Sequence, residues 1–188
     1  GAYLQAEKSS SKGSVYGMAG WAQNAYTFTD HFADDPGKSG LQQLVLKSGW
    51  IQGGQIKGGI SRNVTDEIAL FANAGFVSKV PIFDAIIDDT EGVKNPDPKN
   101  EKFTSVESGM TFRSQDRAIS FDLSGYYTLW KDRTWSIFVP NLIAQGEDGL
   151  VNLLGLDQRH MGIEASAAYQ PSDLLRLDAA ASFGQWKY

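Results

Sequence analysis

Hydrophobic and polar positions alternate along much of this chain. Between residues 119 and 129 one set of alternate positions is apolar: Ile119, Phe121, Leu123, Gly125, Tyr127 and Leu129. The residues between them are mostly polar. Successive side chains of a β-strand point to opposite faces, so this alternation predicts a strand with one apolar and one polar face. Residues 105–113 alternate in the same way, and the polar residues 114–117 between the two segments predict a hairpin turn.

The same pattern recurs along the rest of the chain. A predicted strand at 50–62 leads through a turn at 63–66 to an apolar face at 68–76, and a strand at 163–169 leads through 170–173 to another at 177–183. Residues 14–29 predict one more long strand. The chain therefore holds seven predicted strands, with a possible eighth at 1–8.

The lengths of the connections separate two architectures. Short turns near residues 10, 64, 115 and 172 alternate with long connections at 30–48, 80–102 and 133–157. Most connections in compact soluble domains have about 4 to 6 residues, and strands of a soluble β-sandwich average about 5 or 6. Membrane barrels combine short periplasmic turns, long outer loops and strands of about ten residues or more. We therefore expect an all-β fold, an antiparallel up-and-down transmembrane β-barrel.

Composition removes several other classes of protein. Apolar residues make up 41% of the chain, but no apolar run approaches the roughly 18 to 20 residues of a membrane helix. The net charge of −5 gives no reason to expect a nucleic-acid partner. The chain has no cysteine, which excludes disulfides and thiolate metal sites.

Candidate catalytic chemistry is weak throughout the chain. His31 and His160 are isolated, and the acidic clusters in the long connections do not have the spacing of a calcium loop. Glu107, Asp122 and Glu164 fall on polar strand faces, where they are expected to line a lumen. No nucleophile elbow or phosphate loop is present. We expect no enzyme activity, no catalytic residue, no metal site and no cofactor.

Aromatic residues gather near the predicted strand ends. In a membrane barrel such residues form girdles at the two interfaces. Trp135, just inside a long connection, could instead stack on a sugar or aromatic ligand. The residues in question are Trp21, Trp50, Tyr126, Tyr127, Trp130, Trp135, Trp186 and Tyr188.

Five segments resemble, in order, motifs in the barrel of TonB-dependent outer-membrane receptors of the Bacteroidota type. Residues 71–81 resemble the strand that ends in an aromatic-x-basic-x-Pro exit, and 95–102 resemble the Asn-Pro-x-Leu-Lys-Pro-Glu motif. Pro98 and Asn100 depart from that motif. The other three segments, 105–109, 126–133 and 159–164, resemble a Glu-x-Gly strand, an aromatic strand closing on Lys-Asp, and a Gly-Val-Glu strand start.

The resemblance implies an active transporter for a scarce ligand in the bacterial cell outer membrane. Residues 1–188 would be part of one barrel domain of about 22 strands, with the plug domain absent. Its partners would be outer-membrane lipid, the remainder of the barrel and plug, the TonB complex acting through the plug, and a small-molecule, glycan or peptide ligand. Phe83, Asp84 and Trp135 are the residues expected to contact ligand.

Two alternatives stay open at this point. One is a self-contained eight-stranded outer-membrane barrel that serves as an anchor or adhesion protein. The other is a soluble β-sandwich that binds carbohydrate.

Overall fold

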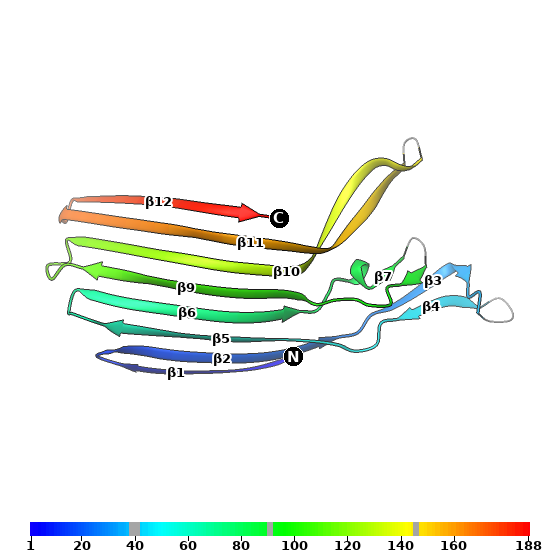
Figure 1. Ribbon diagram of the computed structural model, residues 1–188, viewed down its shortest axis with the longest axis horizontal. Coiled ribbons are helices and arrows are strands. Elements are labelled where there is room, and N and C mark those ends of the chain that lie inside the picture. The colour runs from blue at the N-terminus through cyan, green and yellow to red at the C-terminus, as the bar shows by residue number, and fades with distance from the viewer. Residues whose placement is uncertain (38–41, 90–91, 145–146) are drawn as a thin grey trace.

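One antiparallel sheet of eight strands makes up most of the protein (Figure 1). The computed structural model describes residues 1–37, 42–89, 92–144 and 147–188. In order across the sheet, the strands are β1 (Ala2–Ser10), β2 (Gly13–Asn24), β5 (Ile51–Asn63), β6 (Ile68–Lys79), β9 (Glu101–Arg113), β10 (Ile119–Ala144), β11 (Glu147–Ser172) and β12 (Leu175–Lys187). This up-and-down order confirms the predicted all-β fold and the predicted strand near the N-terminus.

The remaining elements lie at one end of the sheet. A hairpin of β3 (Thr27–Asp34) and β4 (Gln43–Lys47) connects β2 to β5. The described part of the connection from β6 to β9 contains a 3₁₀ turn, η1 (Phe83–Ala85), and the two-residue strands β7 (Ile87–Asp88) and β8 (Val93–Lys94). Tight turns join the strands at the opposite end, on the left of Figure 1. The predicted asymmetry between short turns and long connections is therefore confirmed for the connections at 30–48 and 80–102.

The two faces of the sheet differ in polarity, as the alternation predicts. Asn73, Glu107 and Asp122 share one face through their register across the sheet. The opposite face carries large apolar side chains that are 40–82% exposed: Ile56, Ile60, Leu70, Phe76, Val106, Ile119, Ile163, Leu177 and Phe183. A continuous exposed apolar band of this kind is unfavourable in water and matches the lipid-facing surface of a membrane strand.

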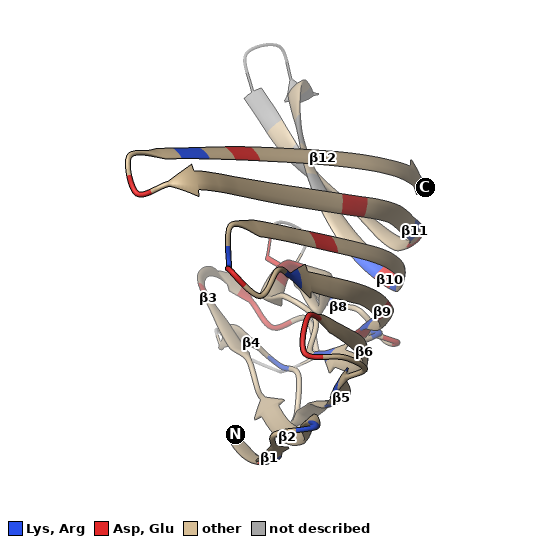
Figure 2. Ribbon diagram, turned by 90° about the vertical axis from the view of Figure 1, so that its left-hand side faces the viewer, with Lys and Arg blue, Asp and Glu red and all other residues tan. Residues whose placement is uncertain are grey.

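The sheet is a single curved layer, which the view along the strands makes plain (Figure 2). Its accessible surface is 13051 Å². A compact soluble protein of this mass would expose about 8,900 Å² according to the usual scaling with mass. A β-sandwich buries one face of each sheet against another sheet. No second sheet covers this one within the described residues, so the architecture is not that of a sandwich.

The expected loop at 133–157 is wrong, because β10 and β11 continue through it as a hairpin. The two strands have 26 residues each, and Trp135, Ile137 and Val139 pair with Leu153, Val151 and Gly149. Register shifts between Trp130 and Trp135, with a positive φ of 56° at Asp132, break the two-residue period at the base of this extension. A β-bulge inserts an extra residue, so the side chains after it point to the opposite faces. The two-residue alternation is interrupted there, and the sequence pattern does not predict that the strand continues.

Residues 14–29 are likewise not one strand. β2 ends at Asn24, and β3 begins at Thr27 after a short break. The Tyr26 backbone N–H donates to Ser48 Oγ at 2.8 Å and so ties the break to the end of the β3–β4 hairpin. Among the described residues there is no helix with the length and apolar character needed to cross a membrane.

Candidate ligand-facing surface

A row of residues crosses the middle of the polar face, one from each strand of the sheet. Each member is in register with its neighbours on the adjoining strands. From β1 to β12 the row is Glu7, Tyr16, Gly59, Asn73, Glu107, Tyr126, Gly162 and Gly184. The row thus holds five polar side chains and three glycines, and each of its two tyrosines is followed by a glycine on one of the next strands.

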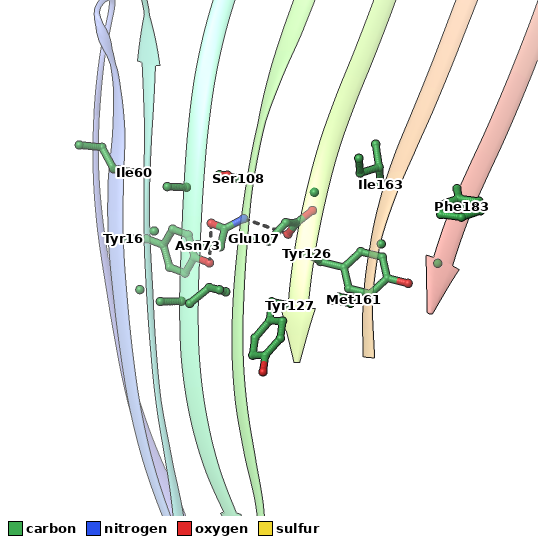
Figure 3. A pocket seen from close by; sticks show the side chains of 18 of the residues that line it. Tyr16, Ile60, Asn73, Glu107, Ser108, Tyr126, Tyr127, Met161, Ile163 and Phe183 are labelled. Carbon is green, nitrogen blue, oxygen red and sulfur yellow. Dashed lines mark hydrogen bonds between the residues drawn. The ribbon is translucent and has the colours of Figure 1, made fainter. Parts of the chain in front are cut away.

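Hydrogen bonds join three members of this row (Figure 3). The Tyr16 hydroxyl donates to Asn73 Oδ1 at 3.2 Å, and Asn73 Nδ2 donates to Glu107 Oε2 at 3.3 Å. All three side chains are half-buried. Asn73 therefore uses both its acceptor and its donor, which fixes its orientation and holds Glu107 against the wall.

The glycines of the row make room for the two tyrosines. A Cβ atom added to Gly59 would collide with the Tyr16 ring and with Asn73 Oδ1. A Cβ atom on Gly162 would lie 2.8 Å from the Tyr126 hydroxyl oxygen, and one on Gly184 would lie 3.2 Å from the same atom. Each tyrosine ring therefore lies across glycine backbone, an arrangement that compensates for the missing side-chain packing of glycine within a strand.

The wall is hollowed at this row. A shallow hollow of about 1180 Å³ takes its lining from β2, β5, β6, β9, β10, β11 and β12. From β5 to β12, each strand contributes its residue of the row together with the residue before it and the residue after it (Figure 3). The lining therefore includes the glycines just described. The sequence pattern predicts the faces of these strands, but it does not predict which residues of different strands stand side by side.

A second polar cluster lies nearer the tight turns. The two terminal guanidinium nitrogens of Arg113 donate to the two Asp122 carboxylate oxygens, at 3.1 and 3.2 Å. The Thr111 hydroxyl also donates to Asp122, at 2.8 Å. Asp122 thus accepts hydrogen bonds from two neighbouring side chains and lies on the polar face, as expected.

A third cluster lies at the other end of the polar face. Glu101, only 2% exposed, accepts a hydrogen bond from Trp130 Nε1 at 3.0 Å and an ion-pair contact from Lys79 Nζ at 3.3 Å. Phe103 packs on the Trp130 ring with 4.4 Å between ring centroids. Trp130 was expected in an interfacial girdle, and that expectation is wrong because its side chain binds partners on the polar face.

The β3–β4 hairpin and the β6–β9 connection pack against each other. Phe83 contacts the rings of Tyr26 and Phe28, with centroids 5.9 and 6.2 Å away. The Tyr26 hydroxyl donates to the Pro81 carbonyl at 3.2 Å. The most deeply buried apolar side chains of the described residues, Ile86 and Ile87, lie directly after this contact. The two connections therefore form one structured platform beyond the end of the sheet.

The three residues expected to contact ligand have different environments. Phe83 is half-buried in the platform and holds it together, and Asp84 is half-buried beside it. Trp135 is 45% exposed on the β10–β11 extension. Asn152, which pairs in register with Ser136, donates to the Asp84 carbonyl at 3.5 Å and connects the extension to the platform.

The residues considered for metal binding are not gathered. His31 Nδ1 lies 2.9 Å from Gln43 Nε2, and His160 Nε2 lies 3.1 Å from Gln158 Oε1. Across the described part of the chain, no three His, Cys, Asp or Glu side chains come close enough together to hold a metal ion. The side chains that do interact closely lie on the polar face and in the aromatic clusters at the loop end.

No protein-family model and no curated protein sequence matches this amino-acid sequence. Among solved structures, the copper transporter OprC superposes with a TM-score of 0.66 at 14% sequence identity. The superposition covers 95% of this chain and 27% of OprC, so the chain spans about a quarter of that protein's length. At this identity the likeness shows the fold alone, which is the antiparallel strand wall of an outer-membrane β-barrel.

Proposed function

We propose that the chain forms part of the wall and outer loops of a TonB-dependent transporter in the bacterial outer membrane. The observation that carries this proposal is the superposition over 95% of the chain onto 27% of a transporter barrel. In this account the apolar face contacts outer-membrane lipid, and the polar row contacts a plug within the lumen. The TonB complex would act through that plug.

The two edges of the sheet support a larger barrel over a closed eight-stranded one. β1 pairs with β2, and β12 pairs with β11. No pairing between β1 and β12 occurs in the described residues, whereas an eight-stranded barrel closes by joining its first and last strands. We propose that residues 1–188 form one section of a barrel domain whose further strands pair with these edges.

The loop end of the sheet is proposed to receive the ligand. The platform around Phe83 and Asp84 and the extension that carries Trp135 stand together at this end (Figure 1). The ligand would be a small molecule, a glycan or a peptide taken up by active transport. OprC is a copper transporter by its name, and that property belongs to OprC.

Semi-native electrophoresis of outer membranes tests this proposal. Samples are run heated and unheated and probed with an antibody against residues 80–102. A heat-modifiable band several times larger than 20.5 kDa is expected, because the section belongs to a larger barrel with a plug. A heat-modifiable band near 20.5 kDa would contradict the transporter and identify a small complete barrel.

A further inference from the structure

The guanidinium group of Arg133 lies over two indole rings at the base of the β10–β11 extension. Its central carbon is 4.3 Å from the centroid of the Trp130 ring and 5.6 Å from that of Trp135. Cation–π contacts of this kind fix the plane of an arginine and exclude water from its faces. The charged side chain is half-buried and held in place.

Among the side chains that the structure describes, no carboxylate forms an ion pair with Arg133. Asp132 pairs instead with Lys102 at 3.0 Å, and Asp157 accepts a hydrogen bond from the Asp132 backbone N–H at 3.2 Å. Glu101 is bound by Lys79 and Trp130. The N–H edge of Arg133 is therefore preorganised and unpaired, which is the geometry that binds a carboxylate or phosphate through two parallel hydrogen bonds.

A buried amide with one unpaired N–H group lies on the neighbouring strand, in register with Trp130. Gln158, the residue that carries this amide, is 3% exposed. Its Oε1 is within 3.1 Å of His160 Nε2, but its Nε2 has no hydrogen-bond partner among the described residues. Buried donors are nearly always satisfied, so this N–H group is available to an acceptor beyond the described residues.

Two exposed aromatic rings lie near Arg133 and His160. Trp135 is 45% exposed and Tyr188 is 77% exposed, with 6.4 Å and a tilt of 32° between the two rings. Tyr188 also contacts His160 at 6.5 Å. Side-chain contacts therefore run from Trp130 through Arg133, Trp135, Tyr188 and His160 to Gln158. The backbone of Gln158 is in register with that of Trp130. We name these six residues the arginine–aromatic cluster.

We infer that the arginine–aromatic cluster binds an anionic ligand that carries a flat ring. A carboxylate or phosphate of the ligand accepts hydrogen bonds from Arg133, and Gln158 Nε2 donates to the same group. The ring stacks on the exposed faces of Trp135 and Tyr188. This inference rests on the proposed function for the cluster's place at the ligand-receiving end, and it narrows the ligand to an organic anion.

Binding to the full chain in detergent tests the inference without any transport step. The probes are benzoate, phenyl phosphate, the neutral analogue benzamide, and acetate, followed by calorimetry or tryptophan fluorescence. Benzoate or phenyl phosphate is expected to bind about tenfold or more tightly than benzamide and acetate. The tighter of the two anions identifies carboxylate or phosphate as the preferred group. Equal affinity for benzoate and benzamide would overturn the inference.

Variants assign the binding to the cluster. Arg133→Gln is expected to remove the preference for the anion, and Arg133→Lys to retain part of it, because lysine keeps the charge but loses the planar pair of donors. Gln158→Leu should weaken anion binding without affecting benzamide. Arg176→Gln is the control, since Arg176 is ion-paired with Asp178 near the tight-turn end of the sheet. Unchanged binding in both Arg133 variants would overturn the inference.

The two proposals can fail separately. Anion binding by the detergent-solubilised chain, together with a heat-modifiable band near 20.5 kDa, would support the anion site and contradict the proposed transporter. A large heat-modifiable band without anion binding would support the proposed transporter and contradict the anion site.

Discussion

Tyr16 and Asn73 lie on strands that are not neighbours, yet the Tyr16 hydroxyl donates to Asn73 Oδ1 at 3.2 Å. The strand between them contributes Gly59, which is in register with both residues. The tyrosine ring crosses this strand because Gly59 has no side chain to block it. The hydrogen-bond network of the polar face therefore depends on a residue that forms none of its side-chain bonds.

Replacing Gly59 by alanine tests this dependence. The new methyl group would occupy space now filled by the Tyr16 ring and the Asn73 amide. We expect Gly59→Ala to destabilise the fold by about 1–3 kcal/mol, the usual cost of overpacking. Urea unfolding in detergent, followed by heat-dependent gel mobility, measures the loss.

Gly17→Ala is the matched control on the neighbouring strand. A Cβ atom there meets nothing within 4 Å. The control variant should stay within about 0.5 kcal/mol of the wild-type protein. Equal destabilisation by the two substitutions would show that the Tyr16–Asn73 contact does not depend on the gap at Gly59.

The buried carboxylate of Glu101 offers a second test. In Glu101→Leu, the indole N–H of Trp130 loses its acceptor and Lys79 loses its partner. The expected destabilisation is about 1–3 kcal/mol, since a buried donor is left unsatisfied while Lys79 can turn toward water. Glu101→Gln keeps an acceptor for Trp130 and should cost less than half as much in the same unfolding assay. Similar losses in both variants would contradict a specific Trp130–Glu101 bond.

The two outer connections should come apart when Phe83 is truncated. Its ring joins the β3–β4 hairpin to the β6–β9 connection through Tyr26 and Phe28. We expect Phe83→Ala to raise the rate of proteolytic cleavage within residues 80–102 about tenfold, because local opening becomes easier. Phe32→Ala, at a fully exposed ring, is the control and should leave the rate unchanged. Equal cleavage of Phe83→Ala and the wild-type protein would contradict the role of Phe83 in the platform.

The tight turn after β9 provides a prediction about pH. Hydrogen bonds from the Ser114 hydroxyl and the Ala118 backbone N–H lower the pKa of the Asp116 carboxyl below its usual value. A carboxyl whose pKa is lowered by folding stabilises the folded turn above its unfolded pKa of about 3.9, and loses that effect as pH falls through the folded pKa. Ser114→Ala should move the pKa of Asp116 back toward its ordinary value in an NMR titration. An unchanged pKa would show that this hydroxyl does not hold the carboxylate.

The faces and hairpins of the sheet could be predicted from the sequence because they depend on local alternation. Ile119 to Leu129 keep strict two-residue spacing, and their strand lies where that spacing puts it. The prediction was wrong at 133–157, where the bulge around Asp132 shifts the phase. A prediction from two-residue alternation does not allow for an inserted residue, after which every side chain changes face.

The residues of the candidate sites were harder to predict from the sequence than the strands. Trp135 was singled out as an aromatic residue near a long connection, and the structure shows it exposed. Arg133 and Gln158 were missed, because their significance depends on which strands pair and in which register. The sequence signal for Arg133 was a cation between two tryptophans, at 130 and 135, which a search for aromatic neighbours of charged residues would have found.

Site-directed spin labelling along residues 119–129 tests the central claim of a membrane-spanning wall most directly. The chain has no native cysteine, so single cysteines can be labelled in the outer membrane or in reconstituted bilayers. Labels at 119, 121, 123 and 127 should be more accessible to oxygen, which partitions into lipid, and labels at 120, 122 and 124 more accessible to a water-soluble nickel reagent. This two-residue oscillation is the result that a wall between lipid and a polar lumen predicts. Uniform accessibility to the nickel reagent at all of these positions would contradict it.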